Sequence, residues 1–94
     1  MIIIEIKDNA KLKLKEYYSL GKEPCAIRIR VKGYTWAGLN ADIVLEELND
    51  PDKFYTYEGI NFIVDKHIEE SFSKVIIEYT QDWFKKGFAV RVKS

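Results

Sequence analysis

The residues best suited to recognition stand together in one glycine-bounded stretch. Between Gly33 and Gly38 the chain carries Tyr34, Thr35 and Trp36. Loops often carry function, and tryptophan and tyrosine are common at the centres of protein interfaces. The alternative is that the indole folds back over the open end of the fold, where both its ring and its N–H are satisfied. Both interpretations stay open, and Tyr34, Thr35 and Trp36 are candidate contacts for a partner or ligand.

A weak candidate metal site lies further along the chain. His67 and Glu70 are three residues apart, a spacing that places both on one face of a helix, with Asp65 nearby. A solvated first turn of a helix explains the same residues, because the helix dipole favours carboxylates there. We therefore expect no metal site and keep His67 and Glu70 only as weak candidates.

Cys25 is the only cysteine in the 94 residues. An internal disulfide therefore cannot form. A free cysteine is either a reactive or metal-binding thiol or, more commonly, a small buried hydrophobe. We expect the structural role.

No residue set predicts catalysis. The carboxylates around one predicted hairpin end are Glu46, Glu47, Asp50 and Asp52. Acid–base catalysis needs such groups partly buried, whereas Asn49 and Pro51 beside them are typical of a solvated turn. A phosphate-binding glycine loop, a Ser–His–Asp set and a Cys-x-x-Cys pair are all missing from the sequence. We expect a non-enzymatic protein without catalytic residues.

Composition excludes several classes of partner. Fifteen basic and fifteen acidic residues cancel, so no overall field attracts nucleic acid or acidic membranes. Lys85 and Lys86 follow Trp83 and Phe84, but a lysine turn explains this pair without nucleic acid. The first residues lack the basic region of a signal peptide, and no stretch reaches the ~20 apolar residues of a membrane span. We expect a single domain, residues 1–94, in the cytoplasm.

The hydrophobic pattern of the first half predicts a strand, a helix and a hairpin. Isoleucines alternate over residues 2–6, and a helix over about 9–20 follows, capped by Asp8 or Asn9 and ended by Gly21. Residues 27–32 and 39–46 alternate with period two. An antiparallel register that pairs Ile29 with Ile43 also pairs Arg30 with Asp42 and satisfies both faces.

The second half predicts another hairpin, a short helix and two strands. Residues 54–57 and 60–64 flank Glu58-Gly59, in which glycine supplies a positive φ. Asp65 caps a short helix, and strands follow at about 74–80 and 88–92. The predicted fold is mainly β (α+β), a β-sandwich or half-barrel of about seven short strands with an N-terminal helix and one short helix.

This order of elements resembles the HesB-like domain of the A-type iron–sulfur carriers over nearly the whole chain. The resemblance rests on the basic strand Ala26–Val31, the run Tyr57–Asp65, the strand Val75–Tyr79 and Gly87-Phe88. In that family the loop after the basic strand contains Gly-Cys-Ser-Gly, and a later tail contains Cys-Gly-Cys. Here residues 33–38 are Gly-Tyr-Thr-Trp-Ala-Gly, and the sequence ends at Ser94 without that tail.

The departure removes the chemistry that the resemblance implies. Iron–sulfur clusters are typically held by four thiolates, and an indole nitrogen has no lone pair for a metal. One cysteine per chain gives only two in a dimer, so we expect no cluster and no other cofactor. The chain most resembles a shortened branch in which some members carry selenocysteine where Trp36 stands. The codons for selenocysteine and tryptophan differ by one base.

Three hypotheses follow. The first is an accessory factor that contacts iron–sulfur assembly proteins through the Gly33–Gly38 loop, with a homodimer as one possible form. The second is a small-ligand or metal-binding module whose pocket is lined by Trp36, Tyr34 and His67. The third is that residue 36 is selenocysteine or cysteine in the native gene or in relatives, and that a redox or cluster function is lost here.

Overall fold

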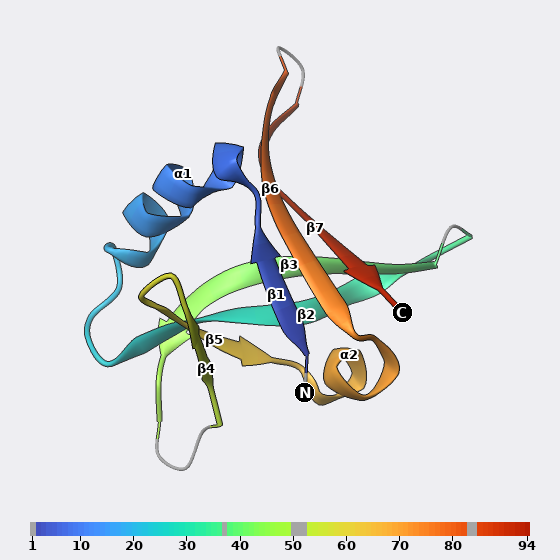
Figure 1. Ribbon diagram of the computed structural model, residues 1–94, viewed down its shortest axis with the longest axis horizontal. Coiled ribbons are helices and arrows are strands. Elements are labelled where there is room, and N and C mark those ends of the chain that lie inside the picture. Colours follow the sequence, from blue (N-terminus) through green and yellow to red (C-terminus); the bar gives the residue numbers. More distant parts are fainter. Residues whose placement is uncertain (1, 37, 50–52, 83–84) are drawn as a thin grey trace.

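The computed structural model describes residues 2–36, 38–49, 53–82 and 85–94, which form seven strands and two helices (Figure 1). In chain order the elements are β1 (Ile3–Ile6), α1 (Asp8–Tyr18), β2 (Cys25–Thr35), β3 (Gly38–Glu47), β4 (Tyr55–Tyr57), β5 (Ile60–Val64), α2 (Lys66–Ser71), β6 (Lys74–Asp82) and β7 (Lys85–Lys93). The predictions that concern Asp50, Pro51, Asp52, Trp83 and Phe84 lie outside the described residues.

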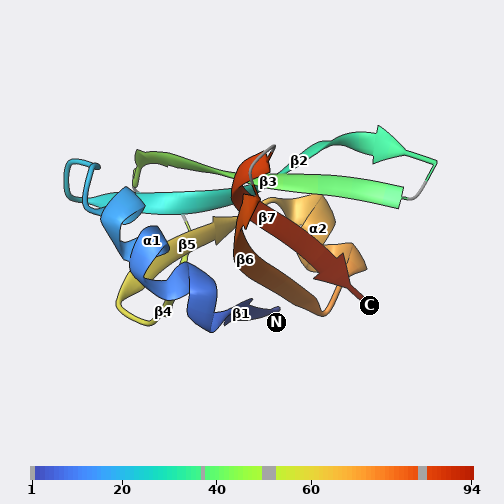
Figure 2. The same ribbon diagram turned by 90° about the horizontal axis from the view of Figure 1, so that it is seen from above.

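All seven described strands belong to one sheet, in the order β1-β6-β7-β3-β2-β5-β4. The β1–β6 and β2–β5 pairs are parallel, and the other pairs are antiparallel. The Tyr57 hydroxyl donates to the Ile2 carbonyl (3.1 Å), which links the strand at one edge to the residue that precedes the other edge. The sheet therefore curls into a nearly closed, barrel-like form, with both helices on the same side of the β2–β3 layer (Figure 2). The predicted fold class is confirmed.

The core follows the period-two alternation of the sequence. In β1, Ile4 and Ile6 are buried and Ile3, which precedes them on the opposite face, is exposed, while Ile27 and Ile29 of β2 are completely buried. The other core side chains that are at most 1% exposed are Ile2, Ala10, Leu14, Ala26, Ile60, Phe62, Ile68, Val75 and Ile77. Burying a side chain of the larger kinds stabilises the fold by roughly 1.5–3 kcal/mol, so this alternation is the main determinant of the sheet. Neither helix of the described chain is long and apolar enough to cross a membrane.

The central hairpin has the predicted register. Ile29 pairs with Ile43 and Arg30 with Asp42, and the Arg30 guanidinium donates to both Asp42 carboxylate oxygens (2.7 and 3.2 Å). The register shifts between Val31 and Gly33, which leaves a bulge. Matching the apolar and the charged faces together thus selects the observed pairing.

The β4–β5 hairpin also forms as predicted, with one addition. Tyr57 pairs with Ile60 across the turn, and Glu58 as well as Gly59 has a positive φ (55° and 77°). Two consecutive positive φ values define the tight turn whose twist matches that of the strands. The sequence alone predicts a positive φ only for Gly59.

The predicted caps of the first helix are wrong. Helix α1 begins at Asp8, its N-cap is Lys7, and no side chain caps it. The Asn9 side-chain oxygen instead accepts a hydrogen bond from the Tyr79 amide of β6 (3.1 Å). The Asn9 side chain thus makes a tertiary hydrogen bond to β6 in place of a local capping hydrogen bond, and this contact holds the helix on the sheet.

Glu5 gives a testable pH dependence. Its carboxylate on β1 contacts the ammonium groups of Lys7 (2.8 Å) and of Lys74 on β6 (2.5 Å). Hydrogen bonds from Lys7 and then Lys74 lower the pKa of Glu5 from 4.5 to about 2. The folded state therefore binds a proton less readily than the unfolded state, so this contribution is complete above pH ~4.5 and is lost as the pH falls toward ~2.

We predict that Glu5→Gln is less stable than the wild type at neutral pH and that the difference shrinks as the pH falls from about 4.5 to about 2. Urea denaturation at a series of pH values measures it. Glu16→Gln, which changes an exposed glutamate without an ion pair in the described structure, is the control. A difference between wild type and Glu5→Gln that does not change with pH would contradict the prediction.

Candidate functional site

The outer half of the β2–β3 hairpin is a two-stranded ribbon that projects from the body of the protein (Figure 1). Strand β2 pairs with β5 only over Ile27–Ile29, and β3 pairs with β7 only at Ala41. In the described structure, residues 33–35 pair only with residues 38–40, and Lys32 and Trp36 flank residues 33–35 without a ladder partner. We call these residues the distal ribbon. Its end is the candidate contact site of the sequence analysis.

The distal ribbon presents two aromatic side chains to water. Trp36 is 100% exposed and Tyr34 is 66% exposed. The interpretation in which the indole folds back over the fold is therefore wrong. Thr35 lies between them, and its hydroxyl contacts the Gly38 carbonyl across the turn (3.5 Å). A large apolar ring held fully in water at a turn is a feature that core packing does not explain.

Charged side chains hold the base of the distal ribbon. The Arg28 guanidinium donates to Glu46 (2.6 Å) and to Asp65 (3.1 Å), and the second Asp65 oxygen accepts the Val31 amide (3.2 Å). Glu46 and then Asp65 raise the pKa of Arg28, so its charge is permanent. Two predictions are corrected here. Glu46 is not part of a solvated turn, and Asp65 occupies the N-cap position of α2 without a side-chain capping bond.

Tyr34 is tied to the second helix. Its hydroxyl lies 2.7 Å from the Nε2 atom of His67, and the two rings meet edge-on with centroids 6.1 Å apart. In the His67 tautomer whose Nε2 carries no proton, Nε2 accepts a hydrogen bond that the Tyr34 hydroxyl donates. The structure thus brings together two of the predicted site residues, and the contact fixes the direction in which the distal ribbon leaves the sheet.

The weak metal candidates do not come together. Glu70 contacts Lys66 (3.9 Å) on the solvent side of α2, and Asp65 is already occupied by Arg28. Among the described residues, no group of three or more His, Cys, Asp or Glu side chains could hold a metal ion. The hypothesis of a pocket lined by Trp36, Tyr34 and His67 keeps only the Tyr34–His67 contact, because Trp36 is fully exposed.

Cys25 lies at the other end of β2. It is 2% exposed, and a Cβ placed on Gly21 would lie 2.8 Å from its sulfur. Gly21 therefore does not end α1, whose C-cap is Ser19; it allows the loop to pass close to the thiol. The two ends of β2, Cys25 and Thr35, are ten residue steps of ~3.3 Å apart, so Cys25 and Trp36 are separated by on the order of 30 Å or more.

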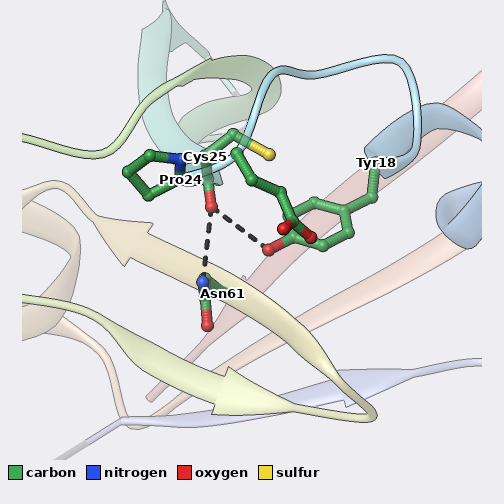
Figure 3. A pocket seen from close by; sticks show the side chains of 5 residues that line it. Tyr18, Pro24, Cys25 and Asn61 are labelled. Atoms are coloured by element: carbon green, nitrogen blue, oxygen red, sulfur yellow. Dashed lines mark hydrogen bonds between the residues drawn. The ribbon is translucent and has the colours of Figure 1, made fainter.

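A hollow of about 450 Å³ lies beside Cys25 (Figure 3). Its lining residues are Tyr18, Glu23, Pro24, Cys25 and Asn61. The Tyr18 hydroxyl (3.1 Å) and the Asn61 amide (3.4 Å) both donate to the Cys25 carbonyl. Burial raises the pKa of Tyr18, which keeps this hydroxyl protonated as a donor. The sequence does not predict the hollow, because its walls come from α1, the loop before β2, and β5, and no local pattern joins these segments.

Comparisons with known proteins agree on the fold. A scan of the sequence against family models and a search of curated proteins find no match. Among solved structures, Escherichia coli SufA, described as involved in biosynthesis of iron–sulfur clusters, matches with a TM-score of 0.69 and 13% identity over 95% of this chain and 79% of SufA. A protein from Aquifex aeolicus matches with a TM-score of 0.66 and 20% identity over 97% of this chain and 92% of its own. IscA with its [2Fe–2S] cluster matches with a TM-score of 0.64 and 18% identity over 98% of this chain and 82% of IscA. This chain therefore has the fold of SufA and IscA.

The packing around Cys25 is directly testable. We predict that Gly21→Ala lowers the free energy of unfolding by about 1–3 kcal/mol, because the added methyl group meets the Cys25 sulfur. Removing the sulfur as well, in Gly21→Ala/Cys25→Ala, should restore part of the loss, and the two changes should not be additive. Urea denaturation of the four proteins measures this coupling.

Gly33→Ala is the matched control. A Cβ at Gly33 meets nothing within 4 Å, so this change should cost little or stabilise slightly. If Gly21→Ala were as harmless as Gly33→Ala, the thiol would not be packed as described.

Proposed function

We propose that this protein is a non-enzymatic, HesB-like binding protein of iron–sulfur cluster assembly that acts by contacting another assembly protein through the tip of the distal ribbon. The observation that carries the proposal is the complete exposure of Trp36 at the place where the resembled family has a cluster-binding cysteine. The fold shared with SufA and IscA supports the process. Fold alone does not fix function, so the role is argued from the site.

The site favours contact over cofactor chemistry. Tyr34 and Trp36 give a large apolar area with few rotatable bonds, and such side chains dominate the energy of many interfaces. The bonds of Arg28, Asp65 and His67 hold the distal ribbon in place before a partner arrives. Preorganisation reduces the entropy lost on binding, and this is what a recognition tip requires.

The same geometry argues against cluster binding in the family manner. The side chain at the family loop position is an indole, which offers no donor electron pair to iron. Cys25 lies on the order of 30 Å or more away along β2, and its buried thiol is packed against Gly21, far from the family loop position. In this proposal the cluster is bound by the partner, and a cytoplasmic location is part of the proposal.

Anaerobic reconstitution tests the cluster argument. We predict that wild-type protein treated with iron and sulfide retains no stable cluster by visible absorption and by iron and sulfide analysis. Cys25→Ala should give the same background. Trp36→Cys restores a thiol at the family loop position and should retain more iron than either. A stoichiometric cluster in the wild type that disappears in Cys25→Ala would contradict the ligand argument.

Affinity capture tests the contact. We predict that the wild type, used as bait in a lysate of its own organism, enriches iron–sulfur assembly proteins and that Trp36→Ala lowers this enrichment roughly tenfold or more, as expected for an interface anchor. Leu12→Ala is the control, because Leu12 is also a large exposed apolar residue (68%) but lies on α1. Equal enrichment by wild type and Trp36→Ala would remove the tip from the proposal.

The selenoprotein-related hypothesis concerns the same position. If residue 36 is selenocysteine in the native gene, the side chain at the tip is a strong nucleophile and not an indole, and the contact model fails. The codon for residue 36 in the native gene distinguishes selenocysteine from tryptophan, because the two codons differ by one base.

A further inference from the structure

The hollow beside Pro24 has the chemistry to accept an indole. Its walls include the Tyr18 ring and the Pro24 ring, two flat surfaces on which an aromatic ring packs well (Figure 3). The carboxylate of Glu23 lies at the same hollow and is an acceptor for an indole N–H. The volume of about 450 Å³ is within the usual range of sites for small aromatic groups.

The rim of the hollow and the distal ribbon carry complementary charges. A neighbouring hollow places Glu47 beside Glu23 and Pro24, with Lys22 as the one cation of that rim. In the described structure neither carboxylate has an ion pair. The distal ribbon carries Lys32, which is exposed and also without an ion pair among the described residues. The contact would therefore bring a cation toward two free carboxylates, which favours the encounter.

One molecule cannot make this contact with itself. Trp36 and Pro24 lie just beyond opposite ends of β2, on the order of 30 Å or more apart, and the whole molecule is only 36 Å long. The occupant must come from another chain. On the β2 side, the bulge after Val31 and the Asp65 bond to the Val31 amide interrupt the open strand edge at the base of the distal ribbon, which disfavours pairing with another strand there.

We propose that copies of this protein associate head to tail, with Trp36 of one chain seated against Tyr18, Glu23 and Pro24 of the next. The interface is heterologous, so it produces chains or rings and not a symmetric pair. One aromatic anchor buries about 150–250 Å², so the association is weak and reversible, in the high micromolar range or above. Association covers the tip when no partner is present, and a partner protein competes for it.

Sedimentation equilibrium of the purified protein up to about 1 mM tests the association. The weight-average mass of the wild type should rise above the 11.0 kDa of one chain with concentration. Trp36→Ala should stay at one chain, and so should Glu23→Lys/Glu47→Lys, which reverses the charge of the rim. Leu12→Ala and Asp8→Lys should behave as the wild type, since they change an exposed apolar residue and an exposed charge on α1 outside the contact.

Mixing the two non-associating variants gives the sharpest test. Trp36→Ala keeps its hollow, and Glu23→Lys/Glu47→Lys keeps its tip, so an equimolar mixture should form complexes of two chains and no larger species. Circular dichroism of each variant confirms that it is folded. Association of Trp36→Ala equal to that of the wild type, a wild type that stays at one chain throughout, or a mixture that does not associate would each overturn the proposal.

The outcome is independent of the function proposed above. The experiment contains only this protein, so a failure of self-association leaves partner capture by Trp36 untouched. Conversely, if Trp36 captures no partner protein from the lysate, the masses measured by sedimentation equilibrium are unaffected.

Discussion

The position of the Asp65 carboxylate is the constraint on which the site depends. The Asp65 amide makes the last hydrogen bond to β2, at the Ile29 carbonyl, and its side chain then accepts the Val31 amide and the Arg28 guanidinium. A backbone N–H that has no strand partner and is shielded from water costs free energy unless another group accepts its hydrogen bond. Asp65 supplies a partner at the residue where β5 ends, so β2 continues as a ribbon and carries Trp36 away from the body.

This junction divides β2 into two parts with different environments. The inner part carries Cys25, Ile27 and Ile29 and is packed on both the core and the α1 loop. The outer part carries Tyr34 and Trp36 and is exposed to water. The Cys25 thiol is thus almost completely buried at the wall of the hollow, whereas the Trp36 ring is fully exposed to water. The division itself favours recognition over cofactor chemistry.

The sequence could predict the features that repeat along the chain. Alternation identified the strands, and the double match of Ile29 with Ile43 and Arg30 with Asp42 determined the central register. The single contacts could not be predicted, because each joins residues far apart in the chain. Asn9 and Asp65 have the composition of helix caps, yet both bond to the sheet. The exposure of Trp36 likewise depends on where β5 ends, which no pattern around Gly33 reveals.

The low identity to SufA and IscA and the shared fold have one explanation. Alternating apolar positions and a few turns are sufficient to specify this sheet, and many sequences satisfy them. Residue 36 lies outside that requirement, since a side chain at the tip of the distal ribbon contributes little to the core. The side chain at the tip can therefore change at almost no cost in stability, whereas the Asp65 junction that supports the tip cannot. Function in this fold is thus free to vary at the tip while the junction that presents the tip is constrained.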